Sequence, residues 1–259
     1  MKATLITGAC INTGVAIVEK FAAEGKNVIF TGRNAEKVHA KEAEYKAKFP
    51  NVEIIGYHID SLIDERTVDE ESVKKMFEFI DEKGIFVETL VLNAADQGLE
   101  MKVFENPLTD FMRVINTNVV WNFCLSEHAA ARMKENGGGS IVFVNSNTAH
   151  RPVPDRIAYV SSKGGQLGLM RALAIDLGKY NIRVNAVLPG LIKTDRWEKY
   201  PERYANNPCR YTPMQDVAIG ADVADAVWYF AVHSRHTTGA ELLVDGGNST
   251  QLYPIMPNS

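Results

Sequence analysis

Tyr159 and Lys163 are the residues of this sequence whose types and spacing best suit proton transfer. They stand four positions apart in a stretch with helical periodicity, so both side chains project from one face of a helix. A free phenol has a pKa of about 10, and a nearby ammonium lowers that pKa by favouring the phenolate. The pair therefore suits a general acid/base, although an exposed Tyr–Lys pair on a helix surface has the same spacing.

Ser146 precedes this pair and directly follows an apolar run that is typical of a strand. Its hydroxyl is a hydrogen-bond donor that can orient a carbonyl oxygen. We therefore expect Ser146 to lie near Tyr159 and to act on the same substrate oxygen.

A glycine-bearing turn from Thr7 to Gly14 follows the first apolar run and precedes a helical pattern. Glycines let backbone amides approach a pyrophosphate, and the amino terminus of the following helix adds a favourable dipole. The turn is typical of dinucleotide sites, and it is also compatible with a tight turn that binds no ligand.

The second apolar run ends in Thr31-Gly32-Arg33-Asn34, without a carboxylate at its tip. Dinucleotide sites that bind a free ribose diol usually carry an acid about 20 residues past the glycines, whereas a 2′-phosphate needs a cation. The Arg33 guanidinium offers forked donors to such a phosphate. The sequence therefore favours NADP over NAD; the alternative interpretation of Arg33 is a solvated residue at a helix start.

Strand-like and helix-like segments alternate along almost the whole chain. This order requires crossover connections, and crossovers produce a mostly parallel sheet with helices on both faces. We expect a Rossmann-like, doubly wound α/β fold with seven strands, in a single domain over residues 1–259. Strands are expected at 4–7, 28–31, 52–59, 90–92, 141–144, 184–188 and 242–244. Helices are expected at 15–24, 35–49, 70–83, 111–136, 158–180 and 222–233.

Two segments interrupt the alternation. Residues 61–69 form an acidic stretch, which we expect to be a surface insertion that does not touch the site. Residues 191–221 follow the sixth strand at the end of the sheet where ligands bind in such folds. We expect this second segment to form a substrate loop or lid.

Composition excludes several classes of partner. With 46% apolar and 23% charged residues and a net charge of −4, the chain is an ordinary globular one with no electrostatic reason to bind nucleic acid or an anionic membrane. Its longest apolar stretch, 226–232, is too short to span a bilayer. Cys10, Cys124 and Cys209 lack metal-ligand spacing, so we expect no metal site and reduced thiols in a cytoplasmic protein.

These motifs occur together and in a fixed order. Asn93-Ala94-Ala95 follows the fourth strand, Pro189-Gly190 with Thr194 follows the sixth, and Val244-Asp245-Gly246-Gly247 follows the seventh. With the glycine turn and the Ser146, Tyr159 and Lys163 set, they resemble the short-chain dehydrogenase/reductase family, specifically its single-domain branch. The resemblance covers residues 3–247 and implies an NAD(P)-dependent enzyme that moves a hydride between the cofactor and a secondary alcohol or ketone.

The resemblance also implies roles for individual residues. Tyr159 is the expected general acid/base, Lys163 the residue that lowers its pKa and holds the nicotinamide ribose, and Ser146 the substrate-orienting hydroxyl. Asn118 corresponds to the helix asparagine that supports a water-linked proton relay to the lysine. The expected cofactor contacts are Gly8, Asn12, Thr13, Gly14, Arg33, Asp60, Asn93, Ala94, Tyr159, Lys163, Pro189, Gly190, Ile192 and Thr194.

Two positions depart from the family pattern, and the insertion after Asp60 lengthens the usual spacing to the next helix. Asn12 stands where the family usually has a glycine, and asparagine tolerates a positive φ better than most residues. Ala95 replaces the usual glycine after Asn93-Ala94, which puts in doubt only how closely the backbone approaches the cofactor there.

The substrate is the least defined part of the site. The expected contacts are Gln97, Ser146, Asn147, Tyr159 and Trp197. The polar set, with Asn145, favours a small hydroxylated metabolite such as a sugar or polyol, whereas the aromatic set Trp197, Tyr200, Tyr204 and Tyr211 favours a larger apolar skeleton.

Two other functions remain open from the sequence. One is reduction of 3-oxoacyl thioesters carried by acyl carrier protein, and the other is a dinucleotide-binding regulator without catalysis. Because family members usually assemble through their long helices, we expect a homotetramer or a dimer, with a small-molecule substrate as the other partner.

Overall fold

A single parallel sheet forms the centre of the computed structural model, which describes residues 1–64, 66–98, 101–105, 107–195, 197 and 212–251. Its strand order is β3-β2-β1-β4-β5-β6-β7, and every neighbouring pair is parallel. The strands are β1 (Lys2–Ile6), β2 (Asn27–Gly32), β3 (Ile54–His58), β4 (Phe86–Leu92), β5 (Gly139–Val144), β6 (Ile182–Pro189) and β7 (Glu241–Val244). The order reverses between β1 and β4, which confirms the expected doubly wound, Rossmann-like fold and marks the place where such sheets bind ligands.

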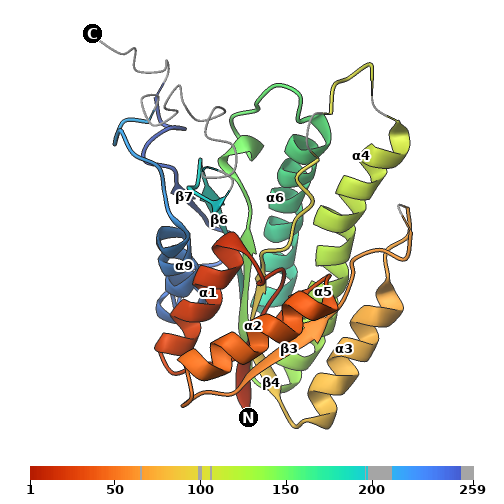
Figure 1. The fold of residues 1–259 in the computed structure, drawn as a ribbon, viewed down its shortest axis with the longest axis vertical. Coiled ribbons are helices and arrows are strands. Elements are labelled where there is room, and N and C mark those ends of the chain that lie inside the picture. Colours follow the sequence, from red (N-terminus) through yellow and green to blue (C-terminus); the bar gives the residue numbers. More distant parts are fainter. Residues whose placement is uncertain (65, 99–100, 106, 196, 198–211, 252–259) are drawn as a thin grey trace.

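Helices cover both faces of the sheet (Figure 1). Helices α1, α2 and α9 pack on one face, and α3, α5 and α6 pack on the other. The helical elements are α1 (Asn12–Ala23), α2 (Ala35–Lys48), α3 (Glu70–Glu82), α4 (Leu108–Ile115), the π-helical turn η1 (Asn116–Val120), α5 (Trp121–Glu135), the 3₁₀ turn η2 (Asn147–Ala149), α6 (Ile157–Gly178), α9 (Gly220–Trp228) and the π-helical turn η4 (Tyr229–His233).

Two hydrophobic cores result from the alternation of side chains along the strands. In β5, Ile141 and Phe143 join the core beneath α3, α5 and α6, whereas Val142 and Val144 join the core beneath α1 and α9. Because both faces of the sheet are covered, the strands consist of nearly continuous apolar runs. This is why the sequence located all seven strands.

The observed boundaries differ from the expected ones where a polar residue or a change of helix type intervenes. Strand β4 begins at Phe86 rather than at residue 90, because Glu88 interrupts the apolar run yet is paired with Lys26 at 2.8 Å. The helix expected at 111–136 is α4 and α5 joined by η1, which holds Asn118. Turns of π-helix occur frequently at functional sites.

The two irregular segments are only partly described. In the 61–69 insertion, Leu62 pairs with Val68 in a closed loop, and the Asp64 side chain accepts from the backbone N–H groups of Arg66 and Thr67. In the 191–221 segment, Ile192 pairs with Ala218, and residues 196 and 198–211 lie outside the described part of the chain.

Two of the three cysteines lie in the described part of the chain. Cys10 and Cys124 are free thiols, and Cys209 lies outside the described residues. Within the ranges that the structure describes, no helix has the length and apolar character needed to cross a membrane. Over the same ranges, no three His, Cys, Asp or Glu side chains gather in a way that could hold a metal ion.

The glycine turn after β1 is held in place by a tyrosine of α2. The Tyr45 side chain is fully buried, its hydroxyl donates to the Ala9 carbonyl at 2.9 Å, and its ring packs edge-on against Phe30. Burial raises the pKa of Tyr45, so the hydroxyl stays a donor over the working pH range. This hydrogen bond links the second helix to the loop that lines the site.

We predict that Tyr45→Phe lowers the free energy of unfolding by about 1–3 kcal/mol, because the Ala9 carbonyl would lose its donor in a buried place. Urea denaturation measures this change. Tyr57→Phe is the matched control, since the Tyr57 hydroxyl has no hydrogen-bond partner in the described part of the chain, and it should change stability by less than about 0.5 kcal/mol. Equal losses in the two variants would contradict the role of Tyr45.

Candidate active site

The carboxyl ends of the strands surround a cavity of about 810 Å³. It extends from the glycine turn and the end of β2 to the start of α6 and the loop after β6. Every residue that we expected to contact the cofactor lines this cavity. The contacts themselves remain predictions, and what the fold establishes is that these dispersed residues come together.

The glycine turn has the geometry of an anion-binding loop. Gly8 has a φ of +65°, and a Cβ there would lie 2.8 Å from the Cα of Ala94. A Cβ on Gly14 would lie 2.5 Å from the Gly8 carbonyl oxygen. Asn12, which replaces the family's glycine, adopts a φ of +49°. The substitution therefore keeps the left-handed backbone that the turn needs.

The amino terminus of α1 fits the pyrophosphate of a dinucleotide. The helix has no side-chain cap and no acidic residue in its first turn, so its first N–H groups have no side-chain acceptor within the described ranges. Asn12, Thr13 and Gly14 of this turn all line the cavity, and the buried Asn12 side-chain oxygen has no hydrogen-bond partner among the described residues. An anion bound here would be stabilised by these N–H groups and by the helix dipole.

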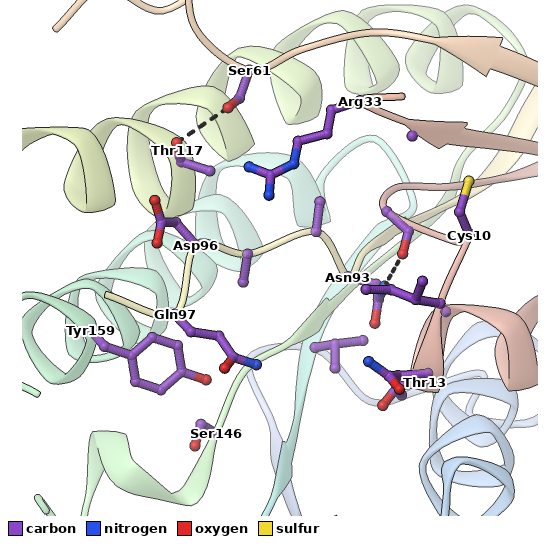
Figure 2. A pocket seen from close by; sticks show the side chains of 18 of the residues that line it. Cys10, Thr13, Arg33, Ser61, Asn93, Asp96, Gln97, Thr117, Ser146 and Tyr159 are labelled. Atoms are coloured by element: carbon purple, nitrogen blue, oxygen red, sulfur yellow. Dashed lines mark hydrogen bonds between the residues drawn. The ribbon is translucent and has the colours of Figure 1, made fainter. Parts of the chain in front are cut away.

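Asn93 fastens the end of β4 to the glycine turn. Its side-chain Nδ2 donates to the carbonyls of Thr7 and Gly8, both at 3.0 Å, and Figure 2 draws one hydrogen bond of Asn93. The Thr7 hydroxyl accepts from the backbone N–H groups of Asn93 and Ala94, both at 3.0 Å. These bonds hold Asn93 and Ala94, which line the cavity, against the glycine turn.

Cations gather at the far end of the cavity. Arg33 is exposed at the end of β2, its side chain has no protein partner in the described part of the chain, and Figure 2 shows it reaching into the pocket. Lys37 of α2 lines the same end. Neither cation is ion-paired with a carboxylate of the described residues, so both can bind a phosphate.

The 61–69 insertion lies closer to the site than expected. Ser61, Leu62 and Asp64 line the cavity next to Asp60. The Ser61 hydroxyl also shares a hydrogen bond of 3.2 Å with Thr117 of η1 (Figure 2). Our expectation that the insertion does not touch the site was wrong, because the loop folds back over the end of β3 instead of extending into solvent.

Tyr159 and Ser146 lie at the other end of the cavity, near Gln97 (Figure 2), and Lys163 lines the cavity with its Nζ over the Tyr159 ring. Burial raises the pKa of Tyr159, while a hydrogen bond from Ser146 and the charge of Arg156 lower it without outweighing burial. The Ser146 oxygen accepts from the Thr148 backbone N–H at 3.2 Å and from the Thr148 hydroxyl at 2.9 Å. Its own proton is therefore left for the Tyr159 oxygen or for a substrate oxygen beside it.

The Lys163 ammonium is enclosed, with its side chain 1% exposed. Nζ donates to the Val144 carbonyl at 3.0 Å and to the Gln166 side-chain oxygen at 3.1 Å, and lies 5.5 Å from the centre of the Tyr159 ring. Burial lowers the pKa of Lys163 to about 7. Lys163 is therefore only partly charged near neutral pH.

Asn118 connects η1, the loop after β4 and α6. Its buried side chain accepts from the Asp96 N–H at 2.8 Å and donates to the Asp96 carbonyl at 2.8 Å and to the Ser162 hydroxyl at 2.9 Å. Because two of these bonds are to the backbone of Asp96, the Asn118 side chain positions the loop after β4 just before Gln97.

Some expected substrate contacts lie elsewhere. Gln97 lines the cavity, whereas Asn147 and Trp197 are not among the residues that line it. The Asn147 amide donates to the side chains of Asn248 and Ser249, both at 3.3 Å, and Trp197 Nε1 donates to the Ile192 carbonyl at 3.2 Å. The residues Tyr200, Tyr204 and Tyr211 lie outside the described part of the chain.

Asn145, which we expected to belong to the polar set around a hydroxylated substrate, makes its hydrogen bonds mainly within the protein. Its Nδ2 donates to the Lys163 carbonyl and to the Gln166 side-chain oxygen, both at 3.0 Å, and its Oδ1 accepts from the Ser146 N–H at 2.7 Å. Both N–H groups of the amide are therefore used inside the protein, and only one lone pair of Oδ1 is left for a substrate.

Sequence reasoning missed Arg156. Its guanidinium carbon lies 5.8 Å from the centre of the Tyr159 ring, and its Nη1 donates to the Gln97 carbonyl at 2.7 Å. Arg156 lines the cavity between these two residues. Its spacing of three positions from Tyr159 places it on the same helix face and could have indicated its location.

The fold and this site define a dinucleotide-binding oxidoreductase, and comparisons with known proteins agree. The model of the family described as enoyl-(acyl carrier protein) reductase matches residues 8–249. The 3alpha-hydroxysteroid dehydrogenase of Mediterraneibacter gnavus is 31% identical over 248 residues, which cover 95% of this chain and 96% of that one.

Two solved structures with bound cofactor are similar over nearly the whole chain. ElxO with NADP bound is 28% identical, with a TM-score of 0.87 and coverage of 96% of this chain and 99% of that one. A 7alpha-hydroxysteroid dehydrogenase complexed with NADH is 30% identical, with a TM-score of 0.85 and coverage of 97% and 96%. The chain belongs to the short-chain dehydrogenase/reductase family, whose members act on CH–OH and C=O groups.

The burial of Lys163 predicts how stability depends on pH. The pKa of Lys163 is about 7 in the folded protein, and its ordinary value, which applies to the unfolded chain, is 10.5. Between these two pH values the unfolded chain therefore binds more protons than the folded protein. The free energy of unfolding of the wild type, relative to Lys163→Met, should therefore rise with pH from about 7 to about 10.

Urea denaturation of the cofactor-free proteins at several pH values tests this prediction. Lys179→Met, which replaces an exposed lysine just after the same helix, is the matched control. A difference between wild type and Lys163→Met that stays constant or falls over this pH range would contradict the burial of the ammonium.

Proposed function

We propose that the protein transfers a hydride between NADP(H) and a secondary alcohol or ketone of a small hydroxylated metabolite, such as a sugar or polyol. The observation that carries this proposal is one cavity with Tyr159, Ser146 and Lys163 at one end and Arg33 at the other. Gln97 beside Tyr159 adds polar groups that suit a hydroxylated substrate.

The proposed chemistry assigns a task to each residue at the catalytic end. A bound nicotinamide supplies or accepts the hydride. In reduction, the Tyr159 hydroxyl donates its proton to the substrate oxygen as negative charge develops there, and in oxidation the phenolate takes the proton from the alcohol. The Ser146 hydroxyl donates a hydrogen bond to the same oxygen and stabilises its charge.

Lys163 has one further task in this proposal. An ammonium has three donors, and two of them reach Val144 and Gln166, so the third is left for the ribose hydroxyls of the cofactor. When Lys163 is charged, its positive charge also favours the phenolate form of Tyr159.

The preference for NADP rests on the cations at the end of β2. Arg33 and Lys37 are the cations that line that end of the cavity, and a 2′-phosphate would complete their hydrogen bonds. Solved relatives with NADP and with NADH are both similar to this chain, so similarity alone does not choose between the cofactors.

A second candidate function is the reduction of 3-oxoacyl thioesters. The similarity of this chain to the 3-oxoacyl-[acyl-carrier-protein] reductase MabA of Mycobacterium tuberculosis, 29% identical over 249 residues, favours it. A panel of sugars, polyols, hydroxysteroids and acetoacetyl thioesters, read by nicotinamide absorbance with both cofactors, separates the candidates. Turnover of thioesters alone would favour the second candidate, and tight NADPH binding with no turnover at all would favour a regulator.

The wider organisation is part of the proposal. We infer that residues 1–259 act as one dinucleotide-binding and catalytic domain in the cytoplasm, with residues 191–221 as the substrate loop. Assembly into a homotetramer or dimer is supported by apolar side chains on the outer surfaces of α5 and α6, where Phe123 is 46% exposed and Ile175 is 81% exposed.

We predict that Tyr159→Phe lowers kcat by about 10²–10⁴-fold, because the acid/base group is lost while the ring still fills its place. The dissociation constant for NADPH, measured by fluorescence titration, should stay unchanged. Tyr57→Phe serves as the control for the loss of a phenol outside the cavity. Normal turnover by Tyr159→Phe would refute the assigned role.

We predict that Arg33→Ala raises the dissociation constant of NADPH by about one to two orders of magnitude, because a charge-assisted hydrogen bond is lost. Binding of NADH should change little, since NADH lacks the 2′-phosphate. Arg235→Ala removes an exposed arginine that does not line this cavity and is the matched control. Equal losses for NADPH and NADH would contradict a phosphate contact.

A further inference from the structure

Gln166 lies behind the catalytic residues and belongs to none of the family motifs. It follows Lys163 by one turn of α6, and its side chain is fully buried. A buried polar side chain needs hydrogen-bond partners, so its contacts indicate what it does.

The Gln166 amide bonds to three residues around the site. Its Oε1 accepts from Lys163 Nζ at 3.1 Å and from Asn145 Nδ2 at 3.0 Å. Its Nε2 donates to the backbone carbonyl of Asn118 at 2.7 Å. One neutral side chain therefore bridges the catalytic ammonium and the carbonyl of the asparagine in η1.

The Asn118 carbonyl is saturated by these contacts. A carbonyl oxygen has two lone pairs, and here one accepts from Gln166 Nε2 and the other from Asn122 Nδ2 at 2.9 Å. The family resemblance implies a water-linked relay between this asparagine and the lysine. In this chain a side-chain amide already makes both hydrogen bonds that such a water would make.

We propose that Gln166 is a positioning residue that holds the Lys163 ammonium at the cofactor site and takes the place of the relay water between Lys163 and Asn118. The inference rests on the proposed roles of Tyr159 and Lys163. Through Asn145, whose Oδ1 accepts from the Ser146 N–H, the same amide also fixes the backbone of Ser146.

Few charged groups compete with Gln166 for influence on the ammonium. Tyr159 is on the same helix, and Arg156 lies over its ring. From the loop after β4, Asp96 lines the cavity and is ion-paired with Arg113. The segments β5 and η1 bring no titratable side chain, and no carboxylate of the described residues lies within 4.0 Å of Nζ.

Two substitutions separate a polar role of Gln166 from simple packing. Gln166→Met keeps the volume and removes every polar atom. Gln166→Ala leaves a space bordered by Lys163 Nζ, the Asn118 carbonyl and Asn145 Nδ2, which is enough polar partners to hold a water molecule. If the amide replaces a water, alanine should preserve function better than methionine. A packing role predicts the opposite order, because the cavity left by alanine is destabilising.

The first readout is the pH profile of kcat/KM for alcohol oxidation. In Gln166→Met the ammonium loses an acceptor and Tyr159 is less well supported as a phenolate, so the apparent pKa of the base should rise by about one unit. In Gln166→Ala it should lie closer to the wild type, although this variant should melt at the lowest temperature. Met170→Leu, a buried and volume-conserving change on the same helix, should leave the profile unchanged.

The second readout does not depend on activity or on a bound cofactor. In protein labelled with ¹³Cε-lysine, the Lys163 signal is assigned by its loss in Lys163→Met, and its titration midpoint is followed by NMR. The midpoint should fall in Gln166→Met and fall less in Gln166→Ala. Gln166→Leu repeats the apolar substitution with a branched side chain of similar size.

The outcomes distinguish the two proposals. A wild type without turnover on any alcohol or ketone would overturn the proposed function, while the NMR titration would still test Gln166. An unchanged Lys163 midpoint in the folded methionine or leucine variant would overturn the role of Gln166. So would an alanine variant whose pH profile departs further from the wild type than that of the methionine variant.

Discussion

The site depends on holding one ammonium group, that of Lys163, inside the protein. A charge in such a place is costly unless hydrogen bonds compensate for the lost water, and the protein supplies the Val144 carbonyl and the Gln166 amide. These two acceptors come from the end of β5 and from α6. Because Ser146 follows β5 and Tyr159 lies on α6, the contacts that hold the lysine also bring the other two reactive side chains together.

Burial gives this lysine a second property. With its pKa lowered to about 7, Lys163 changes between charged and neutral forms near neutral pH, and the support it offers to a Tyr159 phenolate changes with it. The same burial raises the pKa of Tyr159. A cofactor and substrate that fill the cavity would alter both, so the protonation of the pair is coupled to what is bound.

The sequence predicted most of the fold and of the cavity wall. Apolar runs located the strands because both faces of the sheet are buried, and the strand ends then placed residues as distant as Gly8, Arg33 and Thr194 around one cavity. The positive φ of Asn12 was also predictable, since few residue types other than glycine tolerate that backbone.

Other features could not be read from local patterns. Nothing in the sequence of residues 61–69 indicates that the loop turns back onto the cavity, because that depends on the pairing of Leu62 with Val68 and on contact with η1. Asn145 and Asn147 both follow β5, and only the tertiary structure shows that their amides bond within the protein. For Gln166, the only signal in the sequence was a polar residue on a helix face that is otherwise expected to be buried.

The most direct test of this account is a crystal structure of the protein with NADP bound. We predict that the nicotinamide ring lies against Tyr159 and Ser146, that Lys163 Nζ contacts its ribose hydroxyls, and that the 2′-phosphate lies at Arg33. A nicotinamide ring bound away from Tyr159, or a Lys163 side chain that faces away from the cofactor, would contradict the central claim.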